Sequence, residues 1–169
     1  MIKAKKLVPL LRHPKWKAFA KRYAHDPERF AREAQGIYLS EQQEDLAALI
    51  AAPGSRVAVP SGHGTGKTTS IANLCVWHLT TYALSGTLLT ANDMDQMKAT
   101  VWKEIALAVG RIKQGPHAWI ADYIEVLADG TARIRGYEAE WFIEAKTANE
   151  KNANKMAGRH GKRLLIIAD

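Results

Sequence analysis

The sequence predicts an α/β fold in which a mainly parallel β-sheet is covered by helices. Apolar runs at 56–59, 87–91 and 163–168 are typical of strands buried on both faces, and a helical pattern separates the first run from the second. Strands that alternate with helices form parallel sheets, because a crossover helix returns the chain to the same end of the sheet. The 169 residues, of which 47% are hydrophobic, suffice for one domain with a sizeable core.

Residues 1–38 predict a basic helical segment ahead of this α/β unit. A first short helix carries Trp16, Phe19 and Tyr23 on one face, and a proline-containing start signal at 26–28 opens a second helix. The aromatic side chains either pack inward or form a platform on which nucleic-acid bases stack. Core packing is the favoured interpretation, since aromatic stripes at helical spacing usually face inward.

The net charge of +7 resides in this first segment. Residues 1–35 hold ten Lys or Arg and three Asp or Glu, whereas the remaining residues hold fourteen of each. Such a segment either attracts phosphate backbones with salt-dependent affinity or is a solvated helix face. The sequence leaves both interpretations open.

The next helix begins after Ser40 and ends before Pro53. Ser40 is a favourable N-cap, and Gln43 stands where a capping box expects Gln or Glu. A second interpretation is that the Gln43 amide, which both donates and accepts, reads the edge of an adenine base. The local sequence by itself favours the capping-box role of Gln43.

A glycine-rich loop at 60–69 joins the first predicted strand, at 56–59, to a helix. The end of the phosphate-loop pattern G-x-x-x-x-G-K-[ST] is met at Gly66, Lys67 and Thr68. Glycine lets backbone N–H groups turn inward around phosphate oxygens, and a helix N-terminus adds positive potential. Lys67 is therefore expected to reach the β- and γ-phosphates of ATP, and Thr68 to hold Mg²⁺. The nucleotide-binding residues predicted in the loop are Ser61, Gly62, His63, Gly64, Thr65, Gly66, Lys67, Thr68 and Thr69.

Two features of this loop depart from a simple pattern. Ser61 occupies the position of the first glycine, so that Gly62 and Gly64 supply the flexibility instead. His63 either donates to a phosphate or faces solvent. The six histidines do not show the spacing of metal ligands.

The helix after the loop extends over 70–82 and carries the single cysteine, Cys75. A lone cysteine excludes an internal disulfide and a cysteine-based zinc site. Its place in an apolar stripe predicts a small buried side chain rather than a reactive thiol. The strand at 87–91 then leads to one long helix, whose apolar residues recur at spacings of three and four from Met94 to Ile112.

Short alternating runs follow at 123–127, 131–135 and 141–145, and an Asp-Gly turn separates the first two. These runs predict antiparallel strands. We expect residues 117–147 to form a small antiparallel insertion at the edge of the sheet, within an α/β unit at 39–169.

Polar residues at 147–162 predict a surface loop, after which the apolar run at 163–168 ends in Asp169. An apolar strand ending in an acid has the form of a Walker B strand, whose carboxylate holds the water shell of Mg²⁺. No apolar run reaches the roughly 18 residues of a membrane span, which predicts a cytoplasmic protein without membrane contact.

In this order, the features resemble the ATPase domain of the large terminase subunits of tailed phages. The specific likenesses are the loop at 62–68, the strand end at 89–92 followed by Gln96, and residues 157–161 ahead of the Walker B run. The resemblance covers about residues 39–169. It implies a RecA-like P-loop fold and a motor that hydrolyses ATP to drive double-stranded DNA through a portal into a procapsid. The implied partners are the portal protein, the small terminase subunit and further copies of the chain in a ring.

The resemblance also implies roles for individual residues. Gln43 becomes an adenine-reading residue, Lys67 a catalytic and phosphate-binding residue, and Thr68 and Asp169 the magnesium residues. Arg159 becomes a catalytic arginine that stabilises charge near the γ-phosphate.

The chain departs from the family at its end. It stops at Asp169, before the glutamate that activates the attacking water in the family, and without the later ATPase strands and the nuclease domain. One of those later strands lies between the phosphate-loop strand and the Walker B strand in the family. We therefore expect an ATP-binding fragment with an incomplete sheet and weak or absent hydrolysis.

Two other functions fit the same motifs. A helicase-like DNA-stimulated ATPase also has a glutamine ahead of the phosphate loop and a strand ending in Thr-Ala. A non-catalytic nucleotide- and DNA-binding module would use the basic segment for binding and the loop for regulation. ATP-dependent strand separation would favour the helicase, and DNA binding indifferent to ATP would favour the module.

Overall fold

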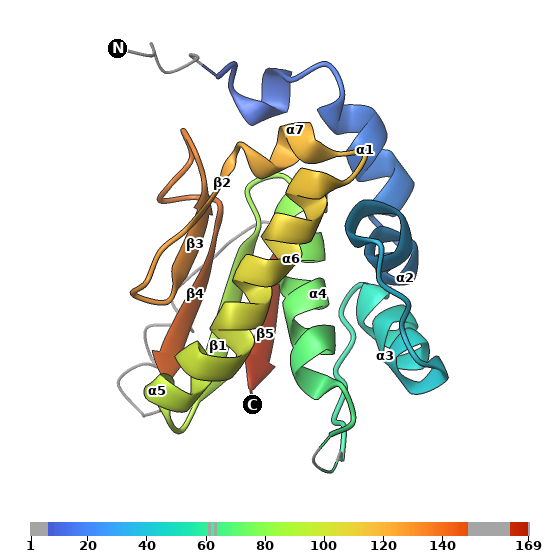
Figure 1. The fold of residues 1–169 in the computed structure, drawn as a ribbon, viewed down its shortest axis with the longest axis vertical. Coiled ribbons are helices and arrows are strands. Elements are labelled where there is room, and N and C mark those ends of the chain that lie inside the picture. The colour runs from blue at the N-terminus through green and yellow to red at the C-terminus, as the bar shows by residue number, and fades with distance from the viewer. Residues whose placement is uncertain (1–6, 61, 63, 149–162, 169) are drawn as a thin grey trace.

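The structure is a computed structural model that describes residues 7–60, 62, 64–148 and 163–168. The described residues form a five-stranded sheet in the order β2-β3-β4-β1-β5, with helices packed beside it (Figure 1). The strands are β1 (Gly86–Ala91), β2 (Ile124–Val126), β3 (Thr131–Ile134), β4 (Phe142–Thr147) and β5 (Leu164–Ala168). The helices are α1 (Trp16–Tyr23), α2 (Pro27–Phe30), α3 (Glu41–Ala51), α4 (Lys67–Thr81), α5 (Met94–Met97), α6 (Lys103–Gln114) and α7 (Ala118–Ala121). Shorter helical turns are η1 (Leu10–Arg12), η2 (Ala31–Gln35) and η3 (Lys98–Trp102).

The predicted α/β class is confirmed, with a mixed rather than a mainly parallel sheet. Strand β1 pairs in parallel with the central strand β4 on one side and with the edge strand β5 on the other. Strands β2, β3 and β4 form the predicted antiparallel run. Because β4 belongs to both sets of pairs, this antiparallel run continues the central sheet.

The prediction of a buried strand at 56–59 is wrong. Residues 55–60 are neither helix nor strand, and Arg56, Ala58 and Val59 are exposed. A strand needs a neighbour with which to exchange hydrogen bonds, and residues 55–60 pair with no strand, not even with the unpaired edge of β5. An open groove of about 460 Å³, lined by residues of 50–57 and 163–166, lies between this segment and β5.

Strand β5 is therefore an open edge of the described sheet. Its residues alternate between exposed and half-buried, and Ile166 is 53% exposed. An apolar edge strand of this kind is a template for pairing with another chain.

The predicted long helix after β1 is present as α5, η3 and α6, with helical backbone angles at both junctions. The turn η3 is π-helical, so one extra residue is accommodated before α6 begins. Val101 and Trp102 of this turn are buried. The apolar stripe therefore continues through the turn.

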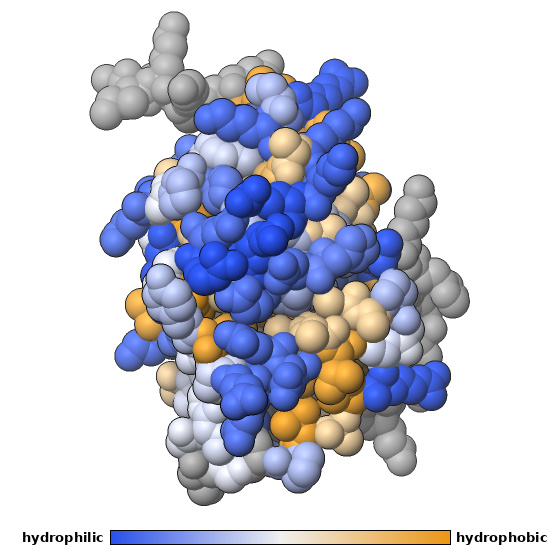
Figure 2. Space-filling model, turned by 90° about the vertical axis from the view of Figure 1, so that its right-hand side faces the viewer, coloured by the Kyte–Doolittle hydropathy of each residue, from blue (hydrophilic) through white to orange (hydrophobic). Residues whose placement is uncertain are grey.

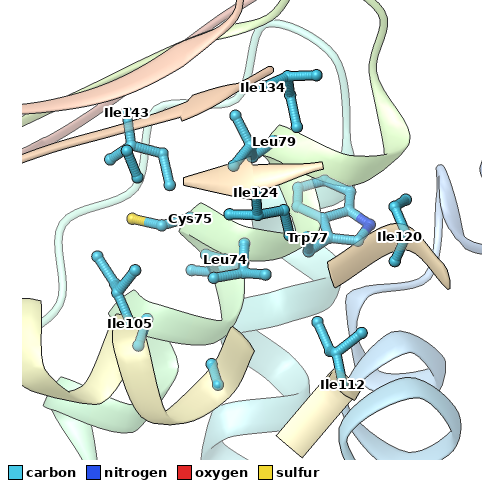
Figure 3. Close-up of a cluster of buried hydrophobic side chains, with 14 of the residues drawn as sticks. Leu74, Cys75, Trp77, Leu79, Ile105, Ile112, Ile120, Ile124, Ile134 and Ile143 are labelled. Atoms are coloured by element: carbon cyan, nitrogen blue, oxygen red, sulfur yellow. The ribbon is translucent and has the colours of Figure 1, made fainter. Parts of the chain in front are cut away.

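Helix α4 is the centre of the core. Ser70 to Thr81 are all buried, so the helix is enclosed on every side, which suits its lack of a polar stripe. Figure 3 shows its side chains among isoleucines from α6, α7 and the sheet. Cys75 is fully buried, as predicted, and burial raises the pKa of its thiol.

The aromatic stripe of α1 packs inward, which confirms core packing as its role. Trp16, Phe19 and Tyr23 are 8%, 3% and 1% exposed. Their rings lie against Phe30, Trp141 and other aromatic side chains of the core. They are therefore not available as a platform for bases. No helix in the described part of the chain is both long and apolar enough to cross a membrane.

Candidate nucleotide-binding site

The glycine-rich loop, the start of α4 and the ends of β1 and β5 lie at the same end of the molecule (Figure 1). Strands β1 and β5 run in parallel and end in register, with Thr90 opposite Ala168. Ligands of open α/β sheets bind outside the carboxyl ends of the strands. The loop is therefore placed where this architecture usually binds a ligand.

The backbone of the loop explains its glycines. Gly64 and Gly66 have φ angles of +77° and +75°, in the left-handed region that residues with a Cβ rarely adopt. A Cβ on Gly66 would also lie 2.5 Å from Nε2 of Gln43, whereas a Cβ on Gly64 would meet nothing within 4 Å. Glycine is therefore required at position 66 by the backbone angle and by the space beside Gln43, and at position 64 by the backbone angle alone.

The N-terminus of α4 is exposed in the described part of the chain. Gly66 is its N-cap and has no side chain with which to cap the helix, and the first turn contains no acidic residue. The first N–H groups of a helix have no partner within the helix and carry a partial positive charge. An exposed end of this kind, followed at once by the exposed Lys67, fits a phosphate group.

Gln43 connects α3 to this loop. Its side-chain oxygen accepts from the backbone N–H of Ser40 at 2.8 Å, and the Ser40 hydroxyl accepts from the N–H of Gln43 at 3.4 Å. The predicted capping box is thus confirmed. The amide nitrogen of Gln43 also donates to the Gly66 carbonyl at 2.9 Å. Since an amide has two N–H donors and two lone pairs, one of each remains for a ligand.

The carbonyl of Gly66 is the point at which loop and helix are held together. It accepts from Gln43 Nε2, from Ser70 N at 3.0 Å and from Ser70 Oγ at 3.2 Å. Nearby, the Thr65 hydroxyl donates to the Gly62 carbonyl at 3.1 Å. We did not predict a role for Ser70. Its only signal in the sequence is its position one turn after Gly66.

The structure brings part of the predicted site together. Thr68 and Thr69 are half-buried in the first turn of α4, and Gly62, Gly64 and Thr65 are exposed in the loop. The Thr68 hydroxyl has no protein partner among the described residues, which suits a magnesium ligand. Within the same residues no group of three or more His, Cys, Asp or Glu could hold a metal ion. The predicted residues Ser61, His63, Arg159 and Asp169 lie outside the described residues.

The buried histidine of α4 is structural. Nδ1 of His78 lies 2.9 Å from the hydroxyl of Thr87 in β1. Burial, and to a smaller extent the charge of Arg163, lower the pKa of His78 to about 4. The side chain is therefore neutral at pH 7, and it lies in the last turn of α4, at the end opposite the loop.

Comparison with known proteins confirms the resemblance to a large terminase subunit. The chain is 26% identical over 160 residues to the probable terminase, large subunit, of Enterobacteria phage P7. The match covers 92% of this chain, which is more than residues 39–169 alone, so it extends into the N-terminal helices. It covers 31% of the phage P7 protein, so the chain spans about a third of that relative's length. No family model and no solved structure match the chain.

Proposed function

We propose that this chain is the nucleotide-binding part of a phage DNA-packaging ATPase of the large terminase type. The observation that carries the proposal is the open N-terminus of α4, which follows two left-handed glycines and carries Lys67 at the end where β1 and β5 stop. These features suit a triphosphate. The similarity to the phage P7 protein supports the packaging context.

In the proposed site the backbone N–H groups at the start of α4 bind phosphate oxygens, and Lys67 neutralises the β- and γ-phosphates. The Thr68 hydroxyl and Asp169 hold Mg²⁺, which withdraws charge from the terminal phosphates when it is bound. Gln43 offers its remaining donor and acceptor to the adenine edge. Arg159 stabilises the charge that develops at the γ-phosphate.

We further propose that this chain acts in a RecA-like ATPase that drives double-stranded DNA into a procapsid, together with the portal, the small terminase subunit and further copies in a ring.

The test is the thermal stability of the chain with and without ATP and Mg²⁺, in the wild type and in Lys67→Ala. A ligand present at 100 times its Kd stabilises the folded state by about 2.7 kcal/mol. We expect the wild type to gain stability and Lys67→Ala to gain none. The matched control is Lys103→Ala, which removes an exposed lysine of α6 and should respond to ATP as the wild type does.

Equal stabilisation of Lys67→Ala and the wild type would contradict the proposed site, because binding would then not use the loop. Absence of any effect in the wild type would contradict nucleotide binding by this chain.

A further inference from the structure

Helix α1 is held in one orientation by its buried side. The indole N–H of Trp16 donates to the Thr80 carbonyl of α4 at 3.1 Å. The carbonyl of Tyr23 in turn accepts from the indole of Trp77 at 2.7 Å. Because both ends of α1 are bonded to α4, the side opposite Phe19 is directed to solvent.

The acidic residues of the N-terminal helices are all paired with arginines. Three acids lie within 4 Å of an arginine on the same segment. The pairs are Asp26 with Arg29, Glu28 with Arg32, and Glu33 with Arg22. The Arg22 hydrogen bond also lowers the pKa of Glu33 to about 2, so both groups of that pair stay charged at neutral pH.

The remaining cations of this segment have no acidic partner among the described residues. They form what we call the basic face: Arg12, Lys15, Lys17 and Lys21. All four are exposed. The excess positive charge of residues 7–38 is therefore gathered on η1 and α1 rather than spread over all the helices.

Two lysines of the basic face lie on the same side of α1. Lys17 and Lys21 are four residues apart on α1, so they lie on one side of the helix and about 6 Å apart along its axis. Arg12 ends η1, and Lys15 is the N-cap of α1. Figure 2 shows a hydrophilic surface over the upper part of the molecule, where Figure 1 places α1 and α2.

We propose that the basic face binds the phosphate backbone of duplex DNA without reading its sequence. Lysines act as point charges toward phosphate, and phosphate contacts position a protein on DNA without carrying sequence information. The aromatic residues of α1 are buried, so base stacking does not contribute. The choice of DNA as the polyanion rests on the proposed function, whereas the location of the site rests on the charges.

The same observations disfavour an anionic membrane. A helix that lies on a membrane surface needs an exposed apolar side next to its basic side. The apolar side of α1 is in the core of this protein. Binding to anionic vesicles is therefore an alternative that the experiment can separate.

The experiment measures the anisotropy of a short fluorescein-labelled duplex as the chain is titrated, at several salt concentrations. We expect binding whose logarithm falls linearly with the logarithm of salt concentration. The double variant Lys17→Ala/Lys21→Ala should reduce the magnitude of this slope by about 2 and weaken binding equally for unrelated sequences. The matched control Lys98→Ala/Lys103→Ala removes two lysines from η3 and α6 and should keep the wild-type slope.

Three results would overturn the inference. They are no binding of duplex by the wild type at low salt, equal losses in the two double variants, and binding of phosphatidylserine vesicles in place of DNA. A thermal midpoint close to that of the wild type confirms that each variant is folded.

The nucleotide site is tested separately by the same proteins. Lys67→Ala should lose ATP binding and retain DNA binding. Lys17→Ala/Lys21→Ala should retain ATP binding and bind DNA more weakly. If the wild type does not bind ATP but Lys17→Ala/Lys21→Ala weakens its DNA binding, the proposed ATPase function is contradicted and the inferred DNA-binding role of the basic face is supported.

Discussion

The two ends of helix α4 differ in their exposure and in the side chains that bind their backbone groups. At its N-terminus the helix is exposed, begins at a left-handed glycine and has no side-chain cap. At its C-terminus the helix is buried, and side chains from elsewhere bind its last carbonyl groups. The Ser85 hydroxyl donates to the His78 carbonyl at 3.0 Å, and the indoles of Trp141 and Trp16 donate to the next two carbonyls at 2.6 and 3.1 Å.

The difference follows from the cost of burying a polar group. A buried carbonyl without a partner costs about 1–3 kcal/mol, so the enclosed end must be satisfied by the protein itself. The open N–H groups at the other end lie in contact with solvent, where water or a ligand can bind them at little cost. The exposed end of the helix, rather than the enclosed end, is thus the end that a ligand can reach.

The largest expected effect on stability comes from removing a hydrogen bond at the buried C-terminus of α4. Trp141→Phe removes the N–H that binds the Leu79 carbonyl and also reduces the volume of a fully buried side chain. We expect the free energy of unfolding to fall by about 3 kcal/mol, measured by urea denaturation.

The matched control for this change is Trp119→Phe. The Trp119 ring stacks on His13 at 4.3 Å, and its N–H has no protein acceptor among the described residues. A loss in Trp141→Phe no larger than in this control would show that the indole bond to α4 contributes little.

A smaller effect is expected from the titration of His78 in the last turn of α4. Its pKa is about 4 in the folded protein and 6.5 as the reference value, so the unfolded state binds more protons between these values. Stability from this residue is complete above pH 6.5 and is lost as the pH falls toward 4. Between pH 7 and pH 5 the free energy of unfolding should fall by about 2 kcal/mol.

The measurement for His78 is the pH dependence of urea denaturation in the wild type and in His78→Asn. Burial also lowers the pKa of His13 and His117, so the variant should lose only part of the dependence. Identical slopes in the wild type and in His78→Asn would contradict this assignment.

The smallest effects on stability are expected at the open end. Gly64→Ala and Gly66→Ala each place a Cβ on a left-handed backbone, which costs about 1–2 kcal/mol. Gly66→Ala also drives its Cβ against the Gln43 amide, so it should cost more than Gly64→Ala and weaken ATP binding further. Chemical denaturation and ATP titration of both variants measure the difference.

Gln43→Ala provides the comparison for the glycine pair. In this background the extra cost of Gly66→Ala over Gly64→Ala should disappear, because the side chain that the new Cβ meets is gone. Persistence of the full difference would show that Gln43 is not the cause of it.

The loop and its neighbours could be predicted from sequence because their signals are local. Ser40 and Gln43 are three residues apart, and a capping box depends only on that spacing and on the start of a helix. Gly66 and Lys67 adjoin the helix they begin, and the inward stripe of α1 follows from helical periodicity. Each of these features is determined within one turn or two of the chain.

Other features depend on residues far apart in the sequence, and only the tertiary structure decided them. Residues 56–59 have the composition of a strand, but a strand also needs a neighbour, and in the fold this segment lies across a groove from the unpaired edge of β5. Trp16 and Trp141 cap α4 from positions more than 60 residues away, so no local pattern identifies them as donors. The clustering of positive charge depends in part on the pair of Arg22 with Glu33, which joins α1 to η2, whereas the pairs of Asp26 with Arg29 and Glu28 with Arg32 lie within one helical turn.

The sequence by itself therefore determined the α/β class, the glycine loop and the capped helix, since backbone geometry and short-range hydrogen bonds specify them. The fold decided which strand-like run found a partner, which helix end was buried and which cations were left exposed. These outcomes depend on burial and pairing between distant segments, and a polar group or strand edge is satisfied only where the folded chain brings a partner to it.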